Sequence, residues 1–372
     1  PWVAIDAMRA DGPVLWSPDL GGYWIIAGAE EVREAYQNGE AFSSYPVGIP
    51  PMVGMWPRKL IPEELDGEEH ARYRRLLAPF FAPKAIRAIA DSVRERAAGL
   101  LRRLADAEGF EVVGQLARPL PSWVFLGLFG APVEQADLFT AWAHDLLHSP
   151  DLAARGAAGQ AIVGYLIGAI AEHRANPGDD MISGLTQASI EGRPLTDEEL
   201  LDMCFLIFVA GLDTVTSQIG TILLHLATHP DDQQAIRHDP AVVDRALEEL
   251  LRLYPIISPA RTLTRDYTLA GVRLKAGDTV LLGSSGATRD PQAFADPTRA
   301  DFGREATWTT AFGLGVHRCL GSHLARQELR VVLELMATTL PPYELAPGAA
   351  WHWHTGGNLW GLDRLDLRFI RS

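Results

Sequence analysis

The longest helix that the sequence predicts begins after Thr196 and ends near His229. Thr196 and Glu199 form a capping box, in which each side chain accepts a hydrogen bond from the other residue's backbone N–H. No proline interrupts the stretch that follows, which gives about 33 residues and, at about 1.5 Å per residue, a length near 50 Å. Few globular helices are that long. We therefore expect this helix to cross the whole molecule, with the other elements packed around it.

The middle of this helix departs from the pattern of a buried apolar helix. Ala210, Gly211, Asp213 and Thr214 place a glycine and two polar side chains inside an apolar run. Such departures tend to mark functional sites. Ala210 and Gly211 would leave room for a small ligand, Thr214 can donate a hydrogen bond, and Asp213 can pass protons. A kinked helix with a satisfied polar pair is the weaker interpretation.

A second constrained stretch is the loop from Phe312 to Gly321, in which Cys319 precedes a helical pattern that starts near Ser322. The glycines of this loop allow its backbone to approach something large and flat. A thiolate at a helix N-terminus is stabilised by unpaired N–H groups and by the helix dipole, so we expect a low thiol pKa. Such a thiolate could bind iron or attack carbon. A buried structural cysteine is the alternative.

The spacing of this loop decides between these interpretations. The pattern Phe-Gly-x-Gly-x-His-x-Cys-x-Gly resembles the haem-thiolate loop of the cytochrome P-450 monooxygenases at every fixed position. The resemblance implies haem b (iron protoporphyrin IX), with Cys319 as the proximal iron ligand and with Phe312, Gly313 and His317 beside the cofactor. A thiolate ligand favours O–O cleavage over reversible O2 binding.

Two further segments that match the family supply cations. His70 and Arg74 lie one helical turn apart, so they share a face. A solvated face is the ordinary interpretation of such a pair, but in the family it meets a haem propionate. Arg261 aligns with the family's second propionate-binding arginine. Pro259 stands where some relatives have a polar or acidic residue, which is a departure from the family pattern.

The same resemblance gives roles to the middle of the long helix. Ala210 and Gly211 would form the groove in which O2 meets the iron. Thr214 would hydrogen-bond the oxygen held there, and Asp213 would feed the proton that cleaves the O–O bond. Glu249 and Arg252, three residues apart, match the family's Glu-x-x-Arg pair, and we expect Arg299 to complete it as a third member.

Composition agrees with one large enzyme domain. The chain has 372 residues, 47% of them hydrophobic, with no linker or repeat that would divide it, so we expect a single domain over residues 1–372. The resemblance implies a mainly α fold with small β-sheets, the triangular helical prism of the family. Two cysteines fit a reducing compartment, and the net charge of −14 argues against nucleic acid and anionic membranes as partners. We expect a cytoplasmic, bacterial-type enzyme without a membrane span.

One part of the chain is expected to be rich in short strands. Residues 256–287 alternate between apolar and polar positions and contain several turn residues. Lys275 to Asp278 has the composition of a hairpin turn, so we predict that Val272–Leu274 and Thr279–Leu282 pair across it.

The resemblance is closest to the three-component bacterial members that hydroxylate camphor, on segments such as Ile61-Pro62 and Gly211 to Val215. It implies insertion of one oxygen atom of O2 into a C–H bond or a double bond. Two electrons would come from NAD(P)H through a reductase and a 2Fe-2S ferredoxin. The alternatives are a peroxide-driven enzyme, which tends to replace the Asp213–Thr214 pair, and a haem sensor or carrier without turnover.

The substrate is predicted from residues that the family places near the haem. Leu206, Val209, Ala210 and Ile257, with Trp56 in the proline-rich loop between residues 43 and 62, indicate a compact apolar pocket and a small terpenoid-like substrate. Arg58 and Lys59 in the same loop favour a second candidate. A cation there could hold a small aromatic or alicyclic carboxylate, although an exposed pair is the ordinary interpretation.

One histidine pair lies outside these motifs. His144 and His148 are four residues apart in a predicted helix, so they share a face. The pair could bind a metal ion, but the sequence shows no third ligand. Core or surface histidines are the favoured interpretation.

Overall fold

The computed structural model describes every residue except 50–57, 306, 357 and 372. Its helices are α1 (Trp2–Asp11), α2 (Ala29–Gln37), α3 (Gly67–Leu77), α4 (Pro83–Arg102), α5 (Pro119–Phe129), α6 (Ala136–His148), α7 (Leu152–Ala175), α8 (Met181–Thr186), α9 (Asp197–Thr228), α10 (Pro230–His238), α11 (Val243–Leu253), α12 (Ser284–Thr288) and α13 (Ser322–Thr339). The first strands are β1 (Val14–Ser17), β2 (Tyr23–Ile26), β3 (Phe42–Ser43), β4 (Gly109–Glu111), β5 (Ser189–Ile190) and β6 (Arg193–Pro194). The later strands are β7 (Ala260–Leu263), β8 (Tyr267–Leu269), β9 (Val272–Leu274), β10 (Thr279–Leu282), β11 (Tyr343–Leu345), β12 (Trp353–Gly356), β13 (Leu359–Leu362) and β14 (Asp366–Phe369).

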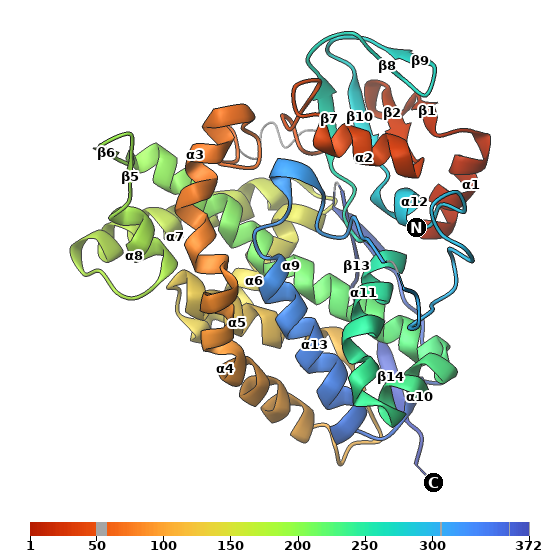
Figure 1. Cartoon of the computed structure of the whole chain (residues 1–372). Coiled ribbons are helices and arrows are strands. Elements are labelled where there is room, and N and C mark those ends of the chain that lie inside the picture. The colour runs from red at the N-terminus through yellow and green to blue at the C-terminus, as the bar shows by residue number, and fades with distance from the viewer. Residues whose placement is uncertain (50–57, 306, 357, 372) are drawn as a thin grey trace.

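The predicted long helix is confirmed as α9, which crosses the middle of the molecule (Figure 1). Thr196 is its N-cap: the Thr196 hydroxyl accepts from the Glu199 N–H at 3.2 Å, and the Glu199 carboxylate accepts from the Thr196 N–H at 2.7 Å. α5, α6, α7 and α13 pack against α9. It is long and apolar enough to cross a membrane, but 67% of its most apolar window is buried inside the protein, as expected of a core helix.

The largest sheet lies at one corner of the molecule, beside α2 (Figure 1), in the order β1-β2-β10-β7-β3. β10 runs parallel to β2 and antiparallel to β7. The predicted hairpin across Lys275 to Asp278 is wrong. β9 instead pairs with β8, through the turn at Ala270 and Gly271, which have positive φ angles of 49° and 80°. Gly277 makes a turn as expected, with φ of 87°, but this turn joins strands of two different sheets.

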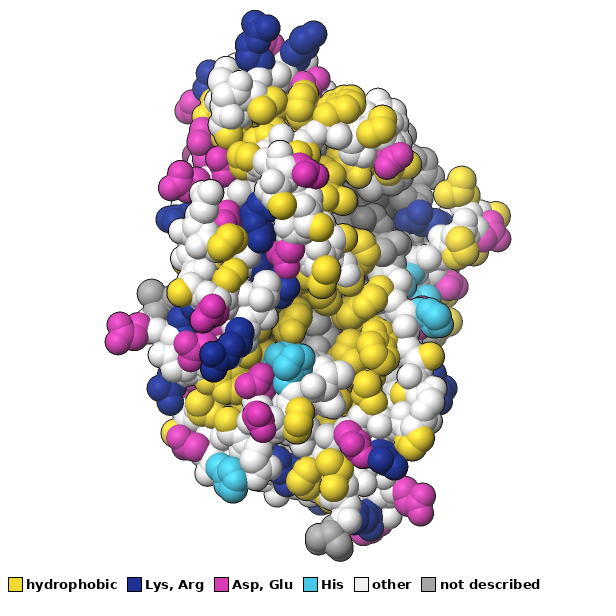
Figure 2. Space-filling model, turned by 90° about the vertical axis from the view of Figure 1, so that its right-hand side faces the viewer, with side chains coloured by type: hydrophobic (Ala, Val, Ile, Leu, Met, Phe, Trp, Pro, Cys, Tyr) yellow, Lys and Arg dark blue, Asp and Glu magenta, His cyan; other side chains and the backbone are white. Residues whose placement is uncertain are grey.

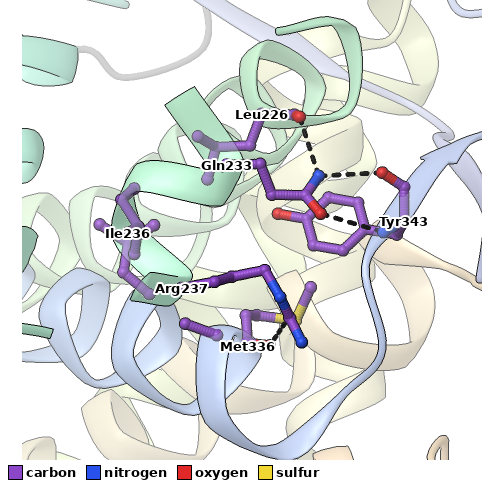
Figure 3. A pocket seen from close by; sticks show the side chains of 8 residues that line it. Leu226, Gln233, Ile236, Arg237, Met336 and Tyr343 are labelled. Atoms are coloured by element: carbon purple, nitrogen blue, oxygen red, sulfur yellow. Dashed lines mark hydrogen bonds between the residues drawn. The ribbon is translucent and has the colours of Figure 1, made fainter. Parts of the chain in front are cut away.

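A small cavity of about 10 Å³ separates the end of α13 from α10 (Figure 3). The buried Gln233 carboxamide lies beside it, donating to the carbonyl oxygens of Leu226 at 3.0 Å and Tyr343 at 2.9 Å and accepting from the Tyr343 N–H at 3.0 Å. These bonds tie the end of α9 to β11. The cavity has room for about one water molecule, so it is a packing feature.

The Glu249–Arg252 pair is buried, with 1% and 0% of the two side chains exposed. Arg252 holds both carboxylate oxygens of Glu249 at 2.7 Å. The prediction that the Arg299 side chain completes this pair is wrong. Arg299 is exposed and contributes only its carbonyl oxygen, which accepts a hydrogen bond from Arg252 at 3.3 Å. Arg304 takes the place instead, with its Nε 3.1 Å from Glu249 Oε1. The turn between the two arginines points Arg299 outward and Arg304 inward, which sequence spacing does not reveal.

Replacing Arg304 with leucine removes one of the two cations that neutralise a buried carboxylate. We predict a loss of about 3 kcal/mol in the free energy of unfolding, at the low end for a broken buried pair because Arg252 remains. Arg299→Leu is the matched control and should change that free energy by less than about 0.5 kcal/mol. Urea unfolding of both variants measures the difference, and an equal loss in the two would contradict this assignment.

Candidate active site

The loop before α13 has a backbone shape that depends on its glycines. The Cys319 N–H donates to the Phe312 carbonyl oxygen at 2.8 Å, which closes the loop on itself. Gly313 and Gly315 have φ angles of 63° and 69°, in the left-handed region that favours glycine. A Cβ on Gly315 would also lie 2.6 Å from the backbone oxygen of Tyr36 in α2. The loop is therefore pressed against α2 in a conformation that other residues would strain.

The Cys319 side chain is accessible, yet protein surrounds it. Burial is the largest influence on its thiol and raises the pKa above the ordinary value. A hydrogen bond from the Gly321 N–H and the charges of Arg74 and Arg318 act to lower this pKa, but they do not outweigh burial. The expectation of a low pKa is thus wrong for the free thiol, because enclosure outweighs the helix terminus. A metal ion would overcome this, since a coordinating thiol is deprotonated outright.

α3 brings two basic side chains to this loop. Arg74 donates a hydrogen bond to the Arg318 carbonyl oxygen, and the rings of His70 and His317 lie 4.0 Å apart between centroids. Burial, followed by the charges of His317 and Arg74, lowers the pKa of His70 to about 4. Neutral His70 and charged Arg74 therefore present N–H donors beside Cys319.

Arg261 on β7 is buried, with 4% of its surface exposed. Its Nη1 donates to the Ala260 carbonyl oxygen at 2.7 Å, and the guanidinium lies over the ring of Tyr36, 5.7 Å from the centroid. Burial lowers the pKa of Arg261, while the charges of Tyr36, Glu63 and Asp66 oppose that effect. A buried guanidinium of this kind favours the binding of an anion.

One face of α9 is uncovered in the middle of the helix, although most of its residues are buried. Leu206, Ala210 and Thr214 follow one another at intervals of four, which places them on one face. Ala210 is exposed, and the other two are half-buried. Val209 has only 9% of its surface exposed. The Thr214 hydroxyl donates to the Ala210 carbonyl oxygen at 3.1 Å, so it lies at this face without breaking the helix.

Comparison with known proteins places this arrangement in a family. The cytochrome P-450 family model matches residues 123–340, more than half of the chain. This chain belongs to the cytochrome P-450 family. A probable cytochrome P-450 127A1 of Sinorhizobium fredii is 34% identical over 99% of this chain and 89% of its own length. The vitamin D(3) 25-hydroxylase of Pseudonocardia autotrophica is 32% identical over 94% of this chain and 88% of its own. The crystal structure of CYP101C1 has a TM-score of 0.89 and 33% identity, covering 100% of this chain and 93% of that one.

The family and its neighbours confirm the expected fold and the enzyme class. The P-450 binds haem b and acts as a monooxygenase on a hydrophobic substrate, with O2 and electrons from a redox partner. The residues of this chain fit that cofactor. The charge of Arg74 acts on Cys319, and that of Glu63 acts on both Cys319 and the buried Arg261, so these groups lie near one another. With His70 they supply an iron ligand and cationic or N–H partners for carboxylates.

Gly211 has a different place in this P-450 from the one expected of it. A Cβ on Gly211 would lie 2.3 Å from the ring of Phe125 in α5. The glycine therefore allows α5 to pack closely against α9, and Ala210 is the small residue of the uncovered face. The expectation that Gly211 opens space for a ligand is wrong. Successive residues of a helix point about 100° apart around its axis, so Ala210 lies on the uncovered face while Gly211 faces α5.

Asp213 is buried and faces a histidine rather than the uncovered face. Its Oδ2 lies 2.7 Å from His148 Nε2, at the end of α6. Burial alone would raise the pKa of Asp213, but His148, with His354 and His144 nearby, lowers it below the ordinary value. The carboxylate is therefore charged and directed toward a histidine cluster.

The expected substrate-binding cation is engaged elsewhere. Arg58 Nε lies 2.8 and 3.0 Å from the two carboxylate oxygens of Asp202 on α9. Lys59 lies over the ring of Tyr45, 5.0 Å from its centroid. Arg58 thus pairs with the buried carboxylate of Asp202, so it is not needed to bind the carboxylate of a substrate. Trp56 lies outside the described residues.

Ile257 is half-buried and bridges to Leu359 of β13, where the Ser258 N–H also donates to the Asn358 carbonyl oxygen at 2.9 Å. The predicted pocket residue thus lies against the C-terminal hairpin β12–β13. Figure 2 shows a hollow in the middle of one face of the molecule, and hydrophobic side chains gather in and around it.

Sequence reasoning missed two groups that lie near these residues. Glu63 directly follows the proline-rich loop. Burial raises the pKa of Glu63 to about 6; the charge of Arg261 opposes this rise, and the charge of Glu64 adds to it. Tyr36 of α2 lies under Arg261 and hydrogen-bonds the Ser284 hydroxyl at 2.8 Å. No motif marks either residue, because both reach Arg261 from distant parts of the chain.

Proposed function

We propose that this P-450 hydroxylates or epoxidises a small apolar, terpenoid-like molecule, with Cys319 as iron ligand and α9 as the wall of the substrate site. The observation that carries this proposal is the uncovered face of α9, on which Leu206, Ala210 and Thr214 leave one polar group in apolar surroundings. The same proposal includes electron delivery by a 2Fe-2S ferredoxin and its reductase, location in the cytoplasm, and one domain over residues 1–372.

Bound haem supplies O2 activation and insertion of one oxygen atom into the substrate. The chain's own residues hold and orient what reacts. Cys319 binds the iron, and Gly321, Arg74 and Arg318 favour its thiolate form. His70, Arg74 and Arg261, with His317 beside them, hold the carboxylates of the cofactor.

Thr214 and Asp213 supply protons in this proposal. The Thr214 hydroxyl lies on the uncovered face, where it could hold or donate a proton to a polar group of a ligand bound against this face. Asp213, its neighbour on α9, is charged and hydrogen-bonded to His148, so it can receive a proton from that side and return it toward Thr214.

The apolar substrate class is favoured over a carboxylate. A buried or half-buried cation would be needed to hold a carboxylate, and Arg58 already binds Asp202 at 2.8 Å. The relative from Pseudonocardia is named for hydroxylating vitamin D3, an apolar molecule. For the redox partner, exposed Arg318 beside Cys319 places positive charge where an acidic ferredoxin would deliver electrons.

Thr214→Ala removes the hydroxyl on the uncovered face and should leave haem binding intact. We expect electron use to become uncoupled: product formed per NADH falls several-fold and hydrogen peroxide rises in proportion. Thr216→Ala is the matched control, because Thr216 is buried on another side of the same helix. Equal coupling in the Thr214 variant and the wild type would remove Thr214 from the proton path.

A Soret-band titration of the ferric protein tests the substrate class. Neutral monoterpenoids and sesquiterpenoids, and aromatic acids of similar size, are added in separate series. We expect a saturable shift toward the high-spin form with the neutral compounds, since an apolar molecule displaces water from the iron. A shift with carboxylates alone would contradict the apolar assignment.

Failure of NADH turnover with every ferredoxin tried would favour a haem sensor or carrier.

A further inference from the structure

Three elements far apart in the sequence bring two carboxylate–imidazole pairs together. His148, the last residue of α6, lies 2.7 Å from Asp213 of α9 through its Nε2. His354 of β12 lies 2.8 Å from Asp363 through its Nδ1. The two imidazole rings are 3.9 Å apart between centroids, so the pairs face each other across a short distance.

The second nitrogen of each ring is buried and has no partner. His148 Nδ1 and His354 Nε2 lack a hydrogen bond to any part of the chain that the structure describes. Only 1% of the His148 side chain and 11% of the His354 side chain are exposed. A neutral imidazole that donates its N–H to a carboxylate carries a lone pair on the other nitrogen. In that tautomer each ring offers a buried lone pair at this cluster, and a buried polar atom without a partner is costly unless something binds it.

We propose that His148, His354 and Asp213 form a binding site for a divalent transition-metal ion of the zinc class. One ligand atom from each of these residues lies within 4.8 Å of the others. Two histidines and a carboxylate, with water in the fourth position, are a common zinc ligand set. Asp363 provides the supporting contact: a carboxylate that accepts the other ring N–H fixes the ligating nitrogen of a metal-binding histidine. Imidazole ligands select zinc-class ions over magnesium or calcium, which prefer oxygen.

A second group shares His354 but is the weaker candidate. His144, His354 and Asp363 also approach one another, but 37% of the His144 side chain and 52% of the Asp363 side chain are exposed. Neither residue has a buried atom without a partner among the described residues. The inner group alone therefore combines burial with unpaired ligand atoms.

The local backbone leaves space for this arrangement. Gly361 of β13 lies opposite His354, and a Cβ there would be 2.4 Å from His354 Nε2 and 2.4 Å from the Ser217 hydroxyl oxygen. Residue 361 thus adds no side chain beside the unpaired nitrogen, and the Ser217 hydroxyl is the other polar group at this position. The fold brings His354 and Asp213 to His148, which the sequence pattern does not show, and His144 is not part of this inner group.

The site includes Asp213, so this step rests on the proposed function. A metal ion that holds Asp213 would keep this carboxylate from passing protons to Thr214. We therefore expect zinc to lower product formed per NADH. Zinc binding can be measured by calorimetry without turnover. The metal site and the role of Asp213 in proton delivery are therefore tested separately. Zinc that binds without changing the coupling would support the site and remove Asp213 from the proton path.

The test titrates Zn²⁺ into the chelator-treated, haem-loaded protein by isothermal calorimetry. We expect one ion per chain with micromolar or tighter affinity, and a loss of at least about tenfold in both His148→Ala and His354→Ala. His352→Ala is the matched control, since this exposed histidine lies two residues from His354 and outside the cluster. The melting temperature of each metal-free variant and its Soret spectrum check that the variant is folded.

His144→Ala separates the inner group from the outer one and should bind zinc as the wild type does. The proposal is overturned if the wild type binds no zinc at about 100 μM, or if His144→Ala loses zinc while His148→Ala retains it. An equal loss in the His352 control would likewise assign the binding to other surface histidines.

Discussion

The architecture depends on one helix that is buried along most of its length and uncovered on one face. α9 has to satisfy its apolar surface against α5, α6, α7 and α13, yet Leu206, Ala210 and Thr214 remain accessible in its middle. Burial of apolar surface contributes about 25 cal/mol per Å², so an uncovered stretch in a central helix is a considerable loss. In the proposed function the cofactor and an apolar substrate would cover this face and offset that loss. The proposal therefore couples binding and folding through the same surface.

The site also depends on rigid contacts that bring the cysteine loop to its partners. Gly313 and Gly315 allow the loop to lie against α2, while α3 contributes Arg74 to the carbonyl of Arg318. A buried ion-pair network at Glu249 holds the segment that leads into this loop. Because each support comes from a different part of the chain, the position of Cys319 depends on the whole fold.

The sequence predicts features that depend on local chemistry. The capping box at Thr196 marked the start of α9 to within one residue, since cap and helix lie in the same few residues. The cysteine loop identified the family for a similar reason. Tertiary contacts were not predictable in this way. Arg304 rather than Arg299 reaches Glu249, Arg58 reaches Asp202, and Gly211 faces Phe125. In each case the side chain's direction depends on a turn or a helix phase that spacing alone does not specify.

The central claim, ligation of haem iron by Cys319, is tested most directly by the carbon-monoxide spectrum of the reduced protein. The account predicts the thiolate-type band in the wild type and in Cys204→Ala, since Cys204 is buried in α9 away from the loop. Cys319→Ser should lose that band while still binding haem through the contacts of His70, Arg74 and Arg261. A thiolate-type band that survives in Cys319→Ser would contradict the assignment of the iron ligand.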